Sequence, residues 1–426
     1  MKIALKKISI ALFLFIGISA ASAQKILTLE EAKQMALEKN SQIRIAQKNV
    51  DAAKAARIGA KASMFPGIGA SVTGFYFGKP IDAILPGYGA SASLGINEGI
   101  YNGGKVKLGM AAAQKEVDMR EEQKVLSTAE VLLNIEKAYW LIASLNEKLS
   151  LATKYEALLQ AFIADLDNSF KAGVLYKNDV LRVQVQLNSA ELNLLKIKDN
   201  LAVAKLSLAQ MIGSNDGDNF SINDSVKGNY SLVDDNTADA VNNRPEINLL
   251  KKTLEQLDIQ TELFRSDYRP SIGVSANGVA AAGKKGINLS DHNSNFLGTY
   301  YGLLSINIPI WDGGATKQRI KAQMFKVSAQ QMQLEETKQL ISIEIRQAYL
   351  QLNESARRIS LSNTSLGQAE ENLRLSNDRF KAGTIISKDV LEAQNIWEQV
   401  NSDLIDAKVQ YKIDEVVLRK AMGVLK

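Results

Sequence analysis

Hydrophobic and polar residues alternate in two matching stretches of this chain. In the first stretch the apolar series is Ala90, Ala92, Leu94, Ile96 and Ile100, and the residues at odd positions are small or polar. In the second stretch the series is Leu304, Ile306, Ile308 and Ile310. A period of two is typical of a β-strand with one apolar and one polar face. Similar runs precede both stretches, so the pattern predicts two hairpins, with strands at about 66–77, 88–101, 270–281 and 299–311.

The predicted strands have the length of membrane-spanning strands, about 10–12 residues. Aromatic residues gather near their ends, as they do at membrane interfaces; these are Phe75, Tyr76, Phe77, Tyr88, Tyr101, Tyr300, Tyr301 and Trp311. A soluble hairpin is the alternative. A membrane barrel needs at least about eight strands, and open sheet edges are not stable in lipid. If the four strands span a membrane, several copies must therefore pool them, and the count leaves two, three or four copies open.

A spacing of seven residues replaces the period of two after each hairpin. The first such series is Val131, Ala138, Leu145, Ala152, Leu159 and Leu166, and a second apolar series runs between its members. This spacing predicts helices at about 104–168, 176–213, 313–378 and 386–423, packed as in coiled coils. The first helix would extend roughly 97 Å. A plain exported coiled-coil protein without a pore is an alternative, but it does not account for the hairpins.

The chain is also a tandem repeat. A shift of 210 positions aligns residues 101–213 with 311–423 without a gap, and a shift of 204 aligns Pro66 with Pro270. The six-residue difference falls within the hairpins. We therefore expect a first repeat at 24–213, a polar linker at 214–236 and a second repeat at 237–426. Each repeat would contain a helix, a β-hairpin, a long helix and a further helix.

The N-terminus has the pattern of an export signal. Lys2, Lys6 and Lys7 precede a short apolar run, and Ala21-Ser22-Ala23 supplies small residues before Gln24. This pattern predicts a signal peptide at 1–23. The apolar run is too short to span a membrane, and no later segment has about 18 consecutive apolar residues.

The composition narrows the chemistry. There are 51 basic and 46 acidic residues without a Lys/Arg cluster, which argues against a nucleic-acid partner. The absence of cysteine excludes disulfides, thiolate metal sites and thiol catalysis. His292 is the only histidine and lies in a polar loop, whereas metal sites need several ligands. We therefore expect no enzyme activity, no cofactor and no bound metal.

Two nearly identical turns separate the long predicted helices from those that follow them. Phe170-Lys171-Ala172-Gly173 recurs as Phe380-Lys381-Ala382-Gly383, and Asp179-Val180-Leu181 recurs as Asp389-Val390-Leu391. A glycine suits the left-handed position after a helix. The aspartate lies where a carboxylate can cap the next helix.

Together these features resemble the TolC family of outer-membrane efflux proteins, over essentially the whole chain after the leader. The motifs that carry the resemblance are the two-copy plan, the paired turns, Arg244-Pro245-Glu246, and the Gly-Gly steps after Tyr101 and Trp311. The resemblance implies a homotrimer that pools four strands per chain into one membrane β-barrel of twelve strands. Below it, an α-helical coiled-coil barrel would extend from the outer membrane into the periplasm.

The resemblance also implies a function. Such a channel passively conducts substrates to the exterior within a tripartite efflux or type I secretion system, together with a periplasmic adaptor and an inner-membrane pump. A free-standing porin, which needs no adaptor, is a further alternative. Which pump and which substrate are involved is not evident from the sequence.

The second turn is implied to line the periplasmic aperture. Family members often narrow this aperture with acidic residues, which correspond here to Asp389 and Glu392. Three copies would place six carboxylates around one constriction and favour cations. The alternative is that Asp389 only caps its helix, as expected of Asp179. Arg182 takes the place of Glu392 in the first copy, which makes this acid specific to the second copy.

Two further expectations concern the turns. Some family members close the tip with a Tyr and an Arg that bond to the first-turn Asp; Phe380 and Ile385 stand at those positions, so this latch is not expected. The exposed turn residues are implied to meet the adaptor, and they are Gly173, Val174, Leu175, Gly383, Thr384 and Ile385. Packing of these residues against Phe170 and Phe380 is the alternative.

Overall fold

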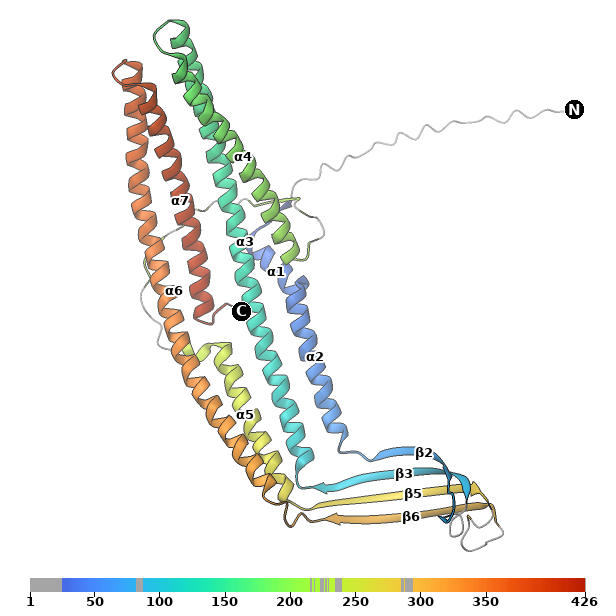
Figure 1. Cartoon of the computed structure of the whole chain (residues 1–426). Helices are drawn as coiled ribbons and strands as arrows, with labels where there is room; N and C mark the ends of the chain where they lie inside the picture. Colours follow the sequence, from blue (N-terminus) through green and yellow to red (C-terminus); the bar gives the residue numbers. More distant parts are fainter. Residues whose placement is uncertain are drawn as a thin grey trace, which may run out of the picture.

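The structure, a computed structural model, describes residues 25–81, 87–214, 217, 219–222, 226, 228, 230–233, 240–284, 287 and 294–425. The predicted signal peptide, His292 and much of the predicted linker 214–236 lie outside these residues. Two long helical hairpins lie side by side, and a sheet extends from one end of them (Figure 1).

The repeat unit is visible in the order of the elements. The strands are β1 (Lys25–Ile26), β2 (Gly67–Tyr76), β3 (Tyr88–Asn102), β4 (Phe220–Ser221), β5 (Ser271–Gly283) and β6 (Phe296–Asn307). The α-helices are α1 (Leu29–Lys39), α2 (Ser41–Ala62), α3 (Lys105–Lys171), α4 (Lys177–Met211), α5 (Pro245–Arg265), α6 (Ala315–Lys381) and α7 (Ser387–Ala421). Two 3-10 helices, η2 (Ala240–Asn243) and η3 (Ser266–Tyr268), flank α5.

The sheet is antiparallel throughout, in the order β2-β3-β5-β6, so that β2 and β6 are its edges. The same strand register occurs in both hairpins. Gly67 pairs with Asn97 in the first, and the equivalent residues Ser271 and Asn307 pair in the second. These pairs reproduce the two sequence shifts of 204 and 210. The strand expected to reach residue 311 instead ends at Asn307. Pro309, which follows closely, has no N–H group to donate to a neighbouring strand.

The two faces of the sheet differ as the period of two predicts. Ile68 pairs with Ile96, and Ile272 pairs with Ile306, so these residues lie on one face. In the single chain Ile68, Ile96 and Ile306 are exposed, and Ile272 is half-buried. The opposite face carries hydroxyl and amide side chains, and the hydroxyls of Ser71 and Ser93 are 2.8 Å apart there.

A β-bulge interrupts this alternation near the end of β3. Glu98 pairs with Val274, but Tyr101 pairs with Ile272, so β3 contains one residue more than β5 between these pairs. The alternation therefore does not continue to Ile100 as the sequence pattern suggested. Tyr101 lies on the apolar face instead.

The helices α3 and α6 have 67 residues each, and α4 and α7 have 35 each. Each long helix is about 100 Å in length at a rise of about 1.5 Å per residue. Both continue about three residues beyond the ends expected from the heptads. In each hairpin the heptad positions are buried between the two helices, as at Leu159 and Leu187 in the first and Ile345 and Leu404 in the second.

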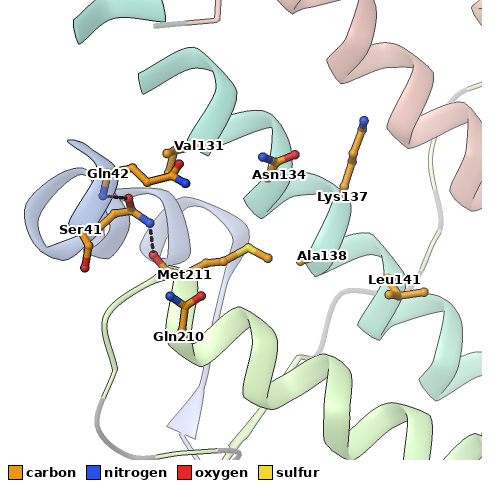
Figure 2. Close-up of a pocket in the computed structure, with 10 residues that line it drawn as sticks. Ser41, Gln42, Val131, Asn134, Lys137, Ala138, Leu141, Gln210 and Met211 are labelled. Atoms are coloured by element: carbon orange, nitrogen blue, oxygen red, sulfur yellow. Dashed lines mark hydrogen bonds between the residues drawn. The ribbon is translucent and has the colours of Figure 1, made fainter. Parts of the chain in front are cut away.

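Equivalent hydrogen bonds hold the start of α2 in the first repeat and the start of α5 in the second. The side chain of Asn40 accepts from the N–H of Gln42, and its Nδ2 donates to the carbonyl of Met211 at the end of α4, at 2.7 Å (Figure 2). In the second repeat, Nη1 of Arg244 donates to the carbonyl of Ala421 at the end of α7, at 2.8 Å. Both bonds satisfy carbonyls that a helix end leaves free. A cavity of about 420 Å³ adjoins the first site.

A buried carboxylate connects the two hairpins near the middle of the molecule. Glu136 on α3 is 1% exposed and forms ion pairs with Lys33 on α1 at 2.8 Å and with Arg419 on α7 at 2.6 Å. Two cations around one buried carboxylate offset the cost of its desolvation. This cluster holds α7 against α3.

Among the described residues, no helix is both long enough and apolar enough to cross a membrane.

Candidate aperture at the tips of the helical hairpins

The two helical hairpins end in the same turn. Gly173 has a φ of 76° and Gly383 a φ of 73°, the left-handed conformation that glycine adopts without strain. The N–H of Gly173 donates to the carbonyl of Phe170, and the next N–H donates to Ser169. This is the Schellman arrangement, and the second turn repeats it. The prediction of a left-handed glycine is confirmed in both copies.

Part of each turn packs inward. Leu175 and Ile385 are half-buried against one hydrophobic cluster that includes Phe162 and Val390 from the two hairpins. The rings of Phe162 and Phe380 meet edge to face with centroids 5.4 Å apart. Phe380 therefore contributes to the apolar contact between the hairpins.

The remaining turn residues are at the surface. Val174 is 73% exposed, and Gly173, Gly383 and Thr384 are exposed as well. The hydroxyl of Thr384 donates to the carbonyl of Arg379 within its own turn. Of the six residues expected to meet an adaptor, these four are exposed, whereas Leu175 and Ile385 pack against the hydrophobic cluster.

Asp179 does not cap its helix, contrary to the expectation from its position. Its carboxylate accepts a hydrogen bond of 2.7 Å from the hydroxyl of Ser387 at the start of α7, and Arg182 lies 3.7 Å away. Ser387 is 2% exposed. Ser387 could not be recognised from the sequence, because a serine at a helix start has the ordinary signature of a cap.

Asp389 and Glu392 are both exposed on the first two turns of α7. Oδ2 of Asp389 accepts from the N–H of Ile386 at 3.3 Å, so this residue does cap its helix. Capping uses one lone pair of one oxygen and leaves the rest of the carboxylate at the surface. Glu392 has no hydrogen-bond or ion-pair partner among the described residues.

A second polar connection joins the hairpins farther along the helices. Tyr155 on α3 hydrogen-bonds through its hydroxyl to Asn395 on α7, and Gln186 on α4 donates to the same hydroxyl at 3.1 Å. Burial raises the pKa of Tyr155. Burial also raises the pKa of the nearby Glu398 carboxyl; Lys148 opposes this shift, and Asp403 adds to it.

The strands themselves carry almost no charge. Within β2, β3, β5 and β6 the one charged side chain is Glu98. The polar face of the sheet presents groups such as Thr73, Asn97, Ser275 and Asn277. The acids at the tips of the helices are therefore at the opposite end of the molecule from an uncharged, hydroxyl-rich surface (Figure 1).

Within the described part of the chain, no group of three or more His, Cys, Asp or Glu side chains is placed to hold a metal ion. The tips contain instead exposed carboxylates, apolar contact between hairpins and a buried hydrogen bond. A sheet with one apolar and one polar face at the end of helices about 100 Å long defines a channel protein that spans one membrane and extends away from it.

Comparison with known proteins agrees with this class. The chain belongs to the outer membrane efflux protein family, whose profile matches residues 32–214 and 237–424. It is 22% identical to outer membrane protein TolC of Escherichia coli, over 97% of this chain and 86% of that protein. It is 19% identical to the alkaline protease secretion protein AprF of Pseudomonas aeruginosa, over 72% of this chain and 64% of that protein.

The fold is shared with solved channels. The open state of the Neisseria gonorrhoeae MtrE outer membrane channel superimposes with a TM-score of 0.77 at 18% identity, over 93% of this chain and 89% of that chain. The family and the fold confirm the predicted fold class and make this chain an outer-membrane efflux channel whose helices extend into the periplasm.

Proposed function

We propose that three copies of this chain form one passive duct across the outer membrane and the periplasm. The observation that carries the proposal is the open sheet: β2 and β6 expose their edges, and both strands are almost entirely at the surface. Free strand edges are not stable in lipid, so neighbouring copies pair β6 with β2 and close a barrel. Three copies supply twelve strands.

The helices support the same assembly. Large apolar residues are exposed along α4 and α6 of the single chain, among them Val185, Leu192, Val203, Leu340 and Ile343. Repeated exposed apolar side chains along a helix are typical of an interface between subunits. In the trimer these faces meet the helices of adjacent copies and form the wall of the helical barrel.

The exposed carboxylates of Asp389 and Glu392 then surround the periplasmic aperture. Six carboxylates around one axis attract cations and repel anions. In the first repeat the equivalent of Glu392 is Arg182, which faces Asp179 instead. The acidic constriction is therefore a property of the second hairpin.

The duct needs partners that supply substrate and energy. The exposed turn surface formed by Gly173, Val174, Gly383 and Thr384 is the proposed docking site for a periplasmic adaptor, and an inner-membrane pump drives transport. The comparisons favour a tripartite efflux or type I secretion system, since the family is named for efflux and one relative for protease secretion.

Capture of the assembly from intact cells tests this proposal. The chain, cross-linked in cells and extracted from the outer membrane, should run as a trimer and carry an adaptor protein with it. Val174→Asp should reduce adaptor capture, whereas Asn193→Asp, at an exposed polar position on α4 away from the tip, should leave it unchanged. Outer-membrane trimers that carry no adaptor with them identify a free-standing porin. Monomers in the periplasm identify a coiled-coil protein without a pore.

A further inference from the structure

A cavity of about 410 Å³ lies where the sheet meets the helices of the first repeat. Glu98 and Ile100 of β3, Met64 after α2, and Lys107 and Met110 of α3 are among the residues that line it. Its volume falls within the range of small-ligand pockets, about 300–1,000 Å³. The helices lie on the periplasmic side, so the cavity is at the level of the inner leaflet of the outer membrane.

Glu98 is an acidic residue among the apolar residues that line this cavity. Its pairing with Val274 puts it on the apolar face of the sheet, next to the bulge. Its Oε2 is buried and has no hydrogen-bond partner. A buried carboxylate oxygen without a donor is costly, so a bound group that supplies an N–H would stabilise it.

Lys107 supplies the opposite charge in the same cavity. Neither Lys107 nor Glu98 has an ion-pair partner among the described residues. The neighbouring Lys105 differs, since it pairs with Asp267 at 2.7 Å. The cavity thus offers one acid and one base, both unpaired, beside apolar side chains that continue onto the lipid-facing surface of the sheet.

The second repeat contains an equivalent cavity that lacks this arrangement. Tyr268 and Ile310 line it in the places of Met64 and Ile100. Ile308 occupies the position equivalent to Glu98. Its acids are satisfied: Asp267 binds Arg319 at 3.2 Å, and Asp312 accepts from two backbone N–H groups. The cavity in the second repeat can therefore be compared with that in the first, because it lacks the unpaired acid.

We propose that the cavity in the first repeat binds a zwitterionic phospholipid with a primary ammonium headgroup. The ammonium donates hydrogen bonds to the buried oxygen of Glu98, and the phosphate lies against Lys107. Met64, Ile100 and Met110 cover the start of the acyl chains. Phosphatidylethanolamine has this chemistry, whereas the quaternary ammonium of phosphatidylcholine has no N–H to donate. The proposal rests on the membrane location of the sheet and is independent of the adaptor and the pump.

Lipid retention by the intact oligomer tests the site. The wild-type protein, delipidated in mild detergent and titrated with dioleoyl phosphatidylethanolamine or dioleoyl phosphatidylcholine, is examined by native mass spectrometry. We expect one tightly held phosphatidylethanolamine per subunit and about tenfold weaker retention of phosphatidylcholine. Glu98→Gln should abolish this preference, and Lys107→Gln should weaken retention of both lipids because both contain the phosphate.

Lys317→Gln, at the equivalent position in the second repeat, is the matched control and should retain lipid as the wild type does. The exposed position of Lys107 makes its variant a test that does not depend on the folding of Glu98→Gln. Equal retention of the two lipids by the wild type would overturn the proposal. So would an unchanged preference in a correctly assembled Glu98→Gln oligomer.

Discussion

The hydroxyl of Ser387 donates a hydrogen bond of 2.7 Å to the carboxylate of Asp179, and this bond joins the tips of the two helical hairpins. The two residues are 208 positions apart and belong to different repeats. Because Ser387 is buried and its acceptor is ionised, the bond is of the stronger kind. Together with the contact between Phe162 and Phe380 of α6, it holds the second hairpin against the first.

Loss of this bond should loosen the aperture. Ser387→Ala removes a hydrogen bond to a charged group, worth about 1.5 kcal/mol, which corresponds to a roughly tenfold larger open population. Single-channel recording should show longer or more frequent openings. Ser169→Ala is the matched control, because Ser169 bonds to a carbonyl of its own helix at the neighbouring tip. If both variants behave like the wild type, the bond does not contribute to closure.

The acidic aperture predicts cation preference. Asp389→Asn combined with Glu392→Gln removes six charges from the trimer without changing side-chain size. The reversal potential in a salt gradient should then shift toward the value of a non-selective pore, because the field at the constriction is lost. Glu191→Gln, an exposed acid on α4 away from the tip, should leave the potential unchanged. An unaltered reversal potential and conductance in the double variant would refute the role of these acids.

Glu398 should make stability depend on pH. Burial raises its pKa in the folded chain, so the folded state holds its proton over a pH range in which the unfolded state has lost it. Stability therefore falls as the pH rises through this range, and the charged Glu398 is unfavourable at pH 7. Glu398→Gln should raise the melting temperature at pH 7, by about 1 °C.

The gain from Glu398→Gln should vanish below about pH 4, where both states are protonated. Glu354→Gln, an exposed acid on α6, is the control and should show no such pH dependence. A gain that is the same at pH 4 and pH 7 would assign the effect to packing rather than to charge.

Arg244 should be essential for the packing of α5 against α6 and α7. Its side chain is 4% exposed and binds Glu246 at 2.7 Å, Glu344 at 3.1 Å and the carbonyl of Ala421. Arg244→Ala leaves the buried carbonyl of Ala421 without its donor and removes both ion pairs, so it should destabilise the chain by about 2 kcal/mol. Arg265→Ala removes an exposed pair on the same helix and should cost less than about 1 kcal/mol. Thermal dissociation of the oligomer measures both, and equal effects would contradict the account.

The features that could be predicted from the sequence are those that depend on residues close together in the chain. The glycine turns at Gly173 and Gly383 follow from a few adjacent residues, and the strands follow from alternation. The partnership of Asp179 and Ser387 could not be predicted, because it depends on how two distant hairpins pack. Glu98 is a different case: an acid among the even, apolar positions of β3 was visible in the sequence, but only the bulge and the cavity reveal that its oxygen is buried.

The central claim is that three copies pool their strands to form one conducting barrel. Planar-bilayer recording of size-fractionated protein tests it most directly, with the mass of each fraction determined in parallel. We predict stepwise conductance from the fraction that contains three chains and none from the single chain. Conductance by the single chain, or a stable trimer that inserts into the bilayer and does not conduct, would contradict the account.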